Sequence, residues 1–112
     1  MGFEVSLRMS GQQAQIELSG DLDASSATRF KEMVELAATR APKRLVLMMR
    51  GLRYMASAGL RVLIFAKQKM GTAAEILLVG AQEGVLQTIK LTGFHQSIVL
   101  LDELPETVAS EG

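Results

Sequence analysis

The 112-residue chain has no cysteine and no tryptophan, and its only histidine is His95. The absence of cysteine excludes disulfide bonds, thiol nucleophiles and thiolate metal sites. A single histidine also argues against a histidine-rich metal centre. We therefore expect neither a metal ion nor a cofactor.

An excess of charge and long hydrophobic runs are also missing. Twelve Lys and Arg residues balance twelve Asp and Glu residues, which leaves no electrostatic footprint for nucleic acid or an anionic membrane. No apolar run approaches the roughly 20 residues that span a bilayer. The first residues lack the basic and apolar regions of a signal peptide. We expect a cytoplasmic protein that binds no nucleic acid and does not insert into a membrane.

The composition that remains is that of a globular protein. Hydrophobic residues make up 48% of the chain and charged residues 21%. A chain of this length can bury one core without metals or disulfides. The sequence contains no repeats or linkers, so it predicts a single domain over residues 1–112.

The hydrophobic pattern predicts five strands. Apolar residues alternate over residues 3–9 and 14–18, and the turn between them contains Gly11, which is typical of a β-hairpin. Continuous apolar runs at 44–49 and 76–79 predict strands buried on both faces. Residues 97–101 predict a short final strand.

Three helices follow from apolar spacings of three and four residues, and a fourth is expected at the end. The first begins after cap candidates at 23–26 and ends before Pro42, the second runs from Ser57 to about Gly71, and the third covers residues 82–92. Gly93 fits the left-handed position after the third helix. Residues 104–109 predict a short last helix. The order of elements predicts an α/β fold with a hairpin at the edge of a parallel sheet that is covered mainly by helices.

The segment around Ser57 joins a buried strand to an apolar helix. Serine is a preferred helix N-cap, because its oxygen can accept a hydrogen bond from a free N–H of the first turn. The same N–H groups and the helix dipole favour a phosphate attached to Ser57 or bound beside it. From the local pattern alone, Ser57 is either a phosphate site or only a cap.

Catalytic arrangements are not apparent. A nucleophilic Ser57 would need a base, and His95 lies in the turn after the third predicted helix with nothing to orient it. Gly20, Gly51 and Gly59 do not form a phosphate-binding loop pattern. We predict that the protein is not an enzyme.

Four short motifs in order resemble the STAS family. They are Gly20–Asp23 after the hairpin, Leu45–Leu47 in the central strand, Met55–Leu60 at the start of a helix, and Leu91–Phe94 near the end. Within that family the chain is similar to the stand-alone bacterial anti-sigma factor antagonists. The resemblance implies a STAS-type mixed sheet, made of an N-terminal hairpin and parallel strands, with three to four helices.

The resemblance also implies a function. Ser57 would be the phosphoacceptor for an anti-sigma factor that is also a serine kinase. The unphosphorylated form would bind this kinase and free the sigma factor, and a serine phosphatase would reset the switch. The residues implied in partner binding are Asp21, Asp23, Ser25, Ala56, Ala58, Gly59 and Arg61. Asp23 is also a candidate cap for the first helix.

Some positions differ from the usual family pattern. Ala56 and Ala58 stand where an acidic residue before the acceptor and a second hydroxyl are usual, and Met48 stands where many members have Asp or Asn. Basic residues are also frequent here, and they either hold a phosphoserine or are solvated surface. These are Arg50, Arg53 and Arg61.

A second function stays open. The chain also resembles STAS subunits that dock on lipid-transport ATPases without being phosphorylated, and Ala56 and Ala58 favour this alternative. Independently of either function, the edge strand of the hairpin could pair with a second copy to form a homodimer.

Overall fold

The computed structural model describes residues 2–104 of the chain. Apart from Leu104, the helix predicted at 104–109 lies outside the described residues. The elements in chain order are β1 (Phe3–Ser10), β2 (Gln13–Leu22), α1 (Ala27–Ala38), β3 (Arg44–Met55), α2 (Ser57–Met70), β4 (Glu75–Val79), α3 (Glu83–Leu91), the 3-10 helix η1 (Phe94–Ser97) and β5 (Val99–Leu101).

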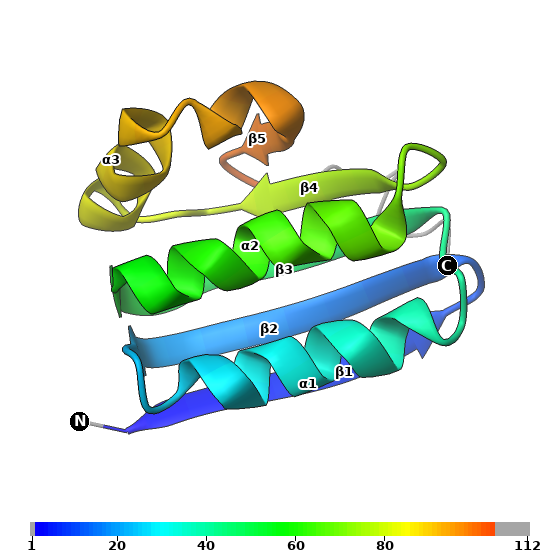
Figure 1. Ribbon diagram of the computed structural model, residues 1–112, viewed down its shortest axis with the longest axis horizontal. Helices are drawn as coiled ribbons and strands as arrows, with labels where there is room; N and C mark the ends of the chain where they lie inside the picture. Colours follow the sequence, from blue (N-terminus) through cyan, green and yellow to red (C-terminus); the bar gives the residue numbers. More distant parts are fainter. Residues whose placement is uncertain (1, 105–112) are drawn as a thin grey trace.

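The five strands form one mixed sheet in the order β1-β2-β3-β4-β5. β1 is antiparallel to β2, and the other neighbouring pairs are parallel. Each crossover helix therefore moves the chain one strand along the sheet in the same direction. Because such crossovers are right-handed, successive helices must lie on the same face. In Figure 1, α1 and α2 lie side by side across one face of the sheet. The predicted fold class is confirmed.

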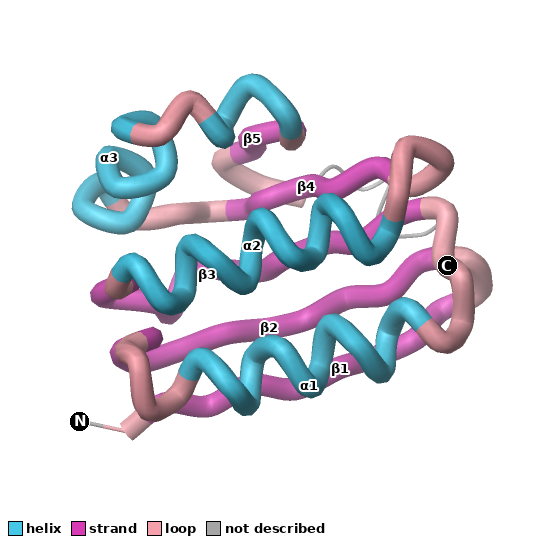
Figure 2. Tube along the Cα trace, in the orientation of Figure 1, coloured by secondary structure: helices cyan, strands magenta, loops and turns pink. Residues whose placement is uncertain are grey.

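The main core lies between this face and the helices. Its buried side chains come from all three α-helices and from alternate positions of the strands, among them Leu45, Leu47 and Met49 of β3. The predicted burial of the central strand on both faces is also confirmed, since Val46 and Leu47 are both fully buried. Among residues 2–104, the second face carries a small apolar cluster around Val46, Leu77 and Val79. Among the described residues, the helices that cover the sheet lie on one of its faces (Figure 2).

The predicted hairpin is present. Gly11 and Gln12 form the turn, and Gly11 has a positive φ of 61°, a conformation that favours glycine. In β1, the half-buried residues Val5, Leu7 and Met9 pack against the main core. The alternate residues are polar and exposed on the opposite face, as expected for a strand with one buried side.

Two strands are longer than the sequence indicates. Gly20–Asp23 was expected to end β2, but pairing with β3 continues to Leu22 through register shifts before Ser19 and before Asp21. Gly20 makes this continuation feasible with a φ of 89°, and a side chain there would collide with the carbonyl oxygen of Gly2. β3 correspondingly runs to Met55 instead of ending near Met49.

The C-terminal elements agree with the prediction except at one boundary. Gly93 has the expected left-handed conformation, with φ 76° and ψ 2°. The final strand begins at Val99 and not at Ser97, because Phe94–Ser97 form a 3-10 helix.

Truncating the core under the helices should destabilise the fold strongly. We expect Leu47→Ala to lower the free energy of unfolding by about 2–5 kcal/mol, since Leu47 is fully buried and the change leaves a cavity. Met48→Ala, at a half-buried position on the opposite face, is the matched control and should cost less. Urea unfolding of the two variants measures the difference, and equal losses would contradict this assignment of the faces.

Candidate functional site at the start of α2

The segment predicted to carry the function lies where β2 and β3 end together. Leu22 and Met55 form the last pair of this parallel ladder. One residue further, the Ala56 N–H donates a hydrogen bond of 2.8 Å to the carbonyl oxygen of Leu22. This bond fixes the start of α2 beside the loop that leads from β2 into α1.

Ser57 is the first residue of α2, and the prediction that it is the N-cap is wrong. The N-cap is Ala56, which has an extended backbone with φ −80° and ψ 170° because its N–H still pairs with Leu22. The Ser57 side chain is exposed, and within residues 2–104 its hydroxyl has no hydrogen-bond partner. The hydroxyl is therefore accessible and not engaged as a cap.

Gly59 lies beneath this surface. A Cβ atom there would be 2.7 Å from Leu22 Cδ2 and 3.0 Å from Met55 Cγ. The backbone of α2 therefore packs directly on Leu22, which explains why the helix needs glycine at this position. Sequence analysis assigned Gly59 to partner binding, whereas the structure places it in the packing that supports the site.

The exposed part of the helix start consists mainly of Ser57 and Arg61. They are four residues apart in α2 and so lie on the same helix face. Ala56 and Ala58 are half-buried beside them. Within residues 2–104, Arg61 makes no hydrogen bond or ion pair. At this spacing its guanidinium can approach a group attached to Ser57.

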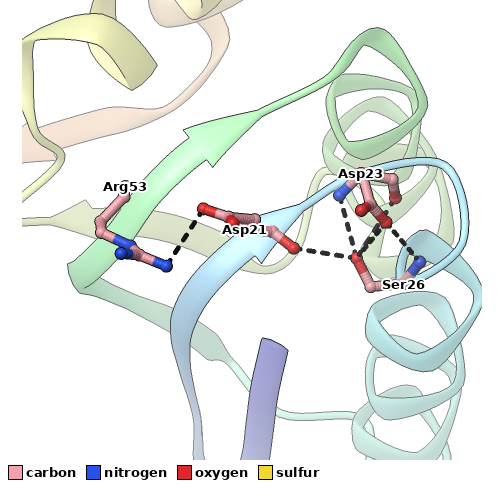
Figure 3. Close-up of polar contacts among 4 residues, drawn as sticks. All are labelled: Asp21, Asp23, Ser26 and Arg53. Atoms are coloured by element: carbon pink, nitrogen blue, oxygen red, sulfur yellow. Dashed lines mark hydrogen bonds and ion pairs between the residues drawn. The ribbon is translucent and has the colours of Figure 1, made fainter. Parts of the chain in front are cut away.

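The loop before α1 is held by reciprocal hydrogen bonds between Asp23 and Ser26 (Figure 3). The Asp23 carboxylate accepts from the Ser26 N–H at 3.0 Å, while the Asp23 N–H donates to the Ser26 hydroxyl oxygen at 2.9 Å. Ser25 adds a hydroxyl bond of 2.7 Å to the same carboxylate. These bonds lie in the turn before α1, whose N-cap is Ser26 and has no side-chain cap hydrogen bond, so the prediction that Asp23 itself caps the helix is wrong. Hydrogen bonds from Ser25 and then from Ser26 lower the pKa of Asp23 below its ordinary value of 3.8.

Asp21 lies on the other side of this loop, in an ion pair with Arg53 of β3. The Arg53 Nη2 atom is 3.5 Å from Asp21 Oδ1, and both side chains are partly exposed, so the pair contributes about 0–1 kcal/mol (Figure 3). Tyr54, the ladder neighbour of Asp21, is 53% exposed. Sequence analysis assigned no role to Tyr54, although exposed tyrosines are common in protein interfaces.

The three arginines differ in what they contact. The Arg50 guanidinium donates to the carbonyl oxygen of Asp102 at 2.7 Å, and the Arg50 carbonyl accepts from Gln82 at 2.9 Å. Arg50 therefore ties β3 to the segments around β4 and β5. Because Arg53 is paired with Asp21, Arg61 alone of the three is without a partner in the described part of the chain.

The site is an open surface. The hollow next to it has a volume of about 200 Å³ and is lined by Asp21, Asp23, Ser25 and residues of β1 and α1. Small-molecule sites are usually larger, at about 300–1,000 Å³, and mostly apolar.

Among residues 2–104 there is no group of three or more His, Asp or Glu side chains that could hold a metal ion. His95 belongs to η1, after α3. No helix in the same range is long and apolar enough to cross a membrane.

These features define a small α/β domain with an exposed serine at a helix start and an acidic loop beside it. The model of the STAS domain matches residues 5–111. The chain belongs to the STAS domain family.

Solved structures with the same fold include several anti-sigma factor antagonists. One from Mycobacterium paratuberculosis superposes with a TM-score of 0.87 at 18% identity, over 97% of this chain and 93% of the other. The antagonist SpoIIAA in its unphosphorylated form gives 0.78 at 17% identity, over 95% and 92%. The Bacillus SpoIIAA in its phosphorylated form gives 0.73 at 16% identity, over 95% and 96%. At these identities the likeness establishes the fold.

Adding a methyl group at Gly59 should loosen the start of α2. We expect Gly59→Ala to lower the free energy of unfolding by about 1–3 kcal/mol, because the Cβ would press on the fully buried Leu22. The control is Gly84→Ala in α3, where a Cβ meets nothing within 4 Å and the higher helix propensity should be neutral or stabilising. Thermal or urea unfolding compares the two, and a neutral Gly59→Ala would contradict the packing described.

The hydrogen bonds of the Asp23 carboxylate should make stability depend on pH. Because folding lowers its pKa, the carboxylate stabilises the fold at pH values above about 3.8, and this contribution is lost as the pH falls through the lowered pKa. Asp23→Asn keeps an oxygen acceptor but removes the charge. The gap in melting temperature between wild type and Asp23→Asn should therefore be present at pH 7 and shrink below about pH 4. A gap that is constant with pH would contradict a charged acceptor.

Proposed function

We propose that this protein is an anti-sigma factor antagonist in a cytoplasmic partner-switching pathway and is not itself an enzyme. In its unphosphorylated form it binds an anti-sigma factor that is also a serine kinase, and phosphorylation of Ser57 releases it. A serine phosphatase restores the binding form. The observation that carries the proposal is the Ser57 hydroxyl, which is exposed and makes no hydrogen bond within residues 2–104. Ser57 is the first residue of α2 in a STAS domain, beside the loop that contains Asp21 and Asp23.

The position of Ser57 suits phosphoryl transfer. A kinase moves the γ-phosphoryl group of ATP onto the serine oxygen, which must be accessible and not committed to another bond. At the start of α2, the Gly59 and Leu60 N–H groups donate to the carbonyl oxygen of Ala56, while the N–H of Ser57 has no intrahelical acceptor. This free donor and the helix dipole favour a phosphate dianion at that point. Phosphorylation therefore needs no rearrangement of the helix.

Release follows from charge. A phosphoserine adds about −1.5 to −2 charges at pH 7. It would stand next to a loop that already presents the carboxylates of Asp21 and Asp23. A partner surface that fits a neutral hydroxyl would have to desolvate this charge and meet its repulsion. Arg61 on the same helix face offsets part of the new charge without removing it.

The comparison with solved structures supports the proposal. SpoIIAA has been solved in unphosphorylated and phosphorylated forms, and both forms resemble this chain over at least 95% of its length. A single rigid fold that accepts both states is what the proposed switch requires. The alternative, an unphosphorylated subunit of a transporter, rests on Ala56 and Ala58, which are half-buried at the edge of the exposed surface.

Phosphorylation should occur at one residue. After incubation with the anti-sigma kinase of its pathway, ATP and Mg²⁺, intact-mass measurement should show one added phosphate on the wild type and none on Ser57→Ala. Ser25→Ala, which removes the exposed hydroxyl of the neighbouring loop, is the matched control and should still gain one phosphate. A stable complex without any phosphate would contradict the switch at Ser57 and would mean a binding subunit that is regulated elsewhere.

Charge at Ser57 should control binding to the same partner. We expect Ser57→Ala to bind constitutively and Ser57→Asp to bind at least about tenfold more weakly, because the carboxylate adds a negative charge that the interface must desolvate. Circular dichroism should show an intact fold for both variants. Equal affinities of the two, measured by calorimetric titration, would rule out a charge-driven release.

A further inference from the structure

The outer edge of β1 pairs with no other strand of the described chain, and Arg29 contacts it only at its beginning, at the carbonyl oxygen of Phe3. β1 is eight residues long, contains no proline, and forms a regular ladder with β2 along its whole length. A hollow of about 450 Å³ lies over the polar face of β1 and β2 beside this edge, and it is lined by Glu4, Val5, Ser6, Glu17, Ser19 and Arg29. The other edge strand, β5, has only three residues. Short strands are protected from edge pairing, whereas long regular ones are templates for it.

The geometry of the hairpin determines which backbone groups point outward. A two-residue turn makes Ser10 and Gln13 the closing hydrogen-bonded pair, and such pairs then alternate along an antiparallel ladder. The N–H and C=O groups of Ser6 therefore face β2, and those of Val5 and Leu7 face the open edge. The outward carbonyl of Phe3 agrees with this alternation, since it accepts a hydrogen bond of 3.0 Å from Arg29.

We propose that a second copy of this chain pairs with this edge, so that two β1 strands run antiparallel about a two-fold axis at Ser6. In this register the outward groups of Val5 meet those of Leu7 of the other copy, and Ser6 faces its own counterpart. The two sheets then form one continuous sheet with all helices on the same side.

Charge complementarity selects this register. Glu4 and Arg8 are exposed on the face opposite the helices, and neither makes an ion pair within residues 2–104. With Ser6 on the axis, Glu4 lies directly across from Arg8 of the other copy, and the symmetry repeats this pair. These are positions without ladder hydrogen bonds, where side chains come closest. A shift of two residues in one direction places Glu4 opposite Ser10 and Arg8 opposite Ser6. A shift in the other direction places Glu4 opposite Ser6 and Arg8 opposite Gly2, so neither register pairs opposite charges.

A second observation comes from α1. Lys31 packs over Phe65 of α2, and Arg29 reaches Phe3 of β1, so these two residues mark opposite flanks of α1. At about 100° per residue, Leu36 falls on the Arg29 flank, toward the β1 edge. Leu36 is 53% exposed. Arg29 contacts Phe3, so distances along α1 and β1 can be counted from this contact. Leu36 lies about 10 Å further along α1, and Ser6 lies about 10 Å further along β1. Leu36 is therefore level with the proposed axis, where a second copy would cover it.

The first test is a charge swap measured by analytical ultracentrifugation over a range of concentrations. The wild type should form a dimer, and Glu4→Arg or Arg8→Glu alone should raise its dissociation constant at least about tenfold, because each creates two like-charge pairs. The double variant Glu4→Arg/Arg8→Glu should restore the wild-type constant to within about threefold. A wild type that is monomeric throughout, or a dimer indifferent to the single changes, would overturn the proposal.

The second test uses the absence of natural cysteine. Opposite residues at such positions have Cα atoms about 4.5 Å apart, within the range that a disulfide spans. Under mild oxidation, Ser6→Cys should therefore form a covalent dimer. Ser10→Cys, on the same strand and face but far from the axis, should not. Cross-linking of both variants alike, or of neither, would contradict the register. These substitutions lie outside the Ser57 surface, so phosphorylation of Ser57 should be unchanged in all of them.

Discussion

The parallel pairing of β2 with β3 is the constraint on which the rest of the site depends. It carries both strands to the same level, at Leu22 and Met55, and ends in the hydrogen bond from Ala56 to Leu22. Gly59 then lets the first turn of α2 rest directly on Leu22. Without this ladder, the acidic loop before α1 and the start of α2 would be two unrelated segments. With it, Ser57 is presented at a fixed distance from the loop, on a helix that the core holds in place.

This arrangement separates the surface that we propose to be phosphorylated from the packing that supports it. Ser57 and Arg61 are exposed, and their removal leaves no cavity, whereas Gly59 and Leu22 are buried beneath them. The neighbouring loop is stabilised independently by the hydrogen bonds between Asp23 and Ser26. A charge added at Ser57 therefore changes the electrostatic surface without disturbing either support. Such an arrangement suits a switch that changes the affinity for a partner and leaves the fold of the domain unchanged.

Much of the fold could be predicted from the sequence, because each strand and helix has a clear hydrophobic period. The boundaries next to the site could not. Gly20 and Asp21 are strand breakers by composition, yet pairing with β3 carries the strand past them through bulges. For the same reason Ala56 stays extended, and Ser57 becomes the first helical residue and not the cap. The role of Gly59 was also hidden, since it depends on Leu22, which is distant in sequence. A polar turn at residues 23–26 was predictable because its hydrogen bonds are local, although the N-cap of α1 is Ser26 and not Asp23.

The central claim is that Ser57 is a charge switch on a rigid surface. The most direct measurement is an amide NMR comparison of the unphosphorylated and the fully phosphorylated protein. The account predicts chemical-shift changes confined to the loop at residues 21–26 and the segment at residues 53–61, with the strands and α3 unchanged. Changes spread through the sheet and the core would contradict it, because they would mean that phosphorylation acts by rearranging the fold.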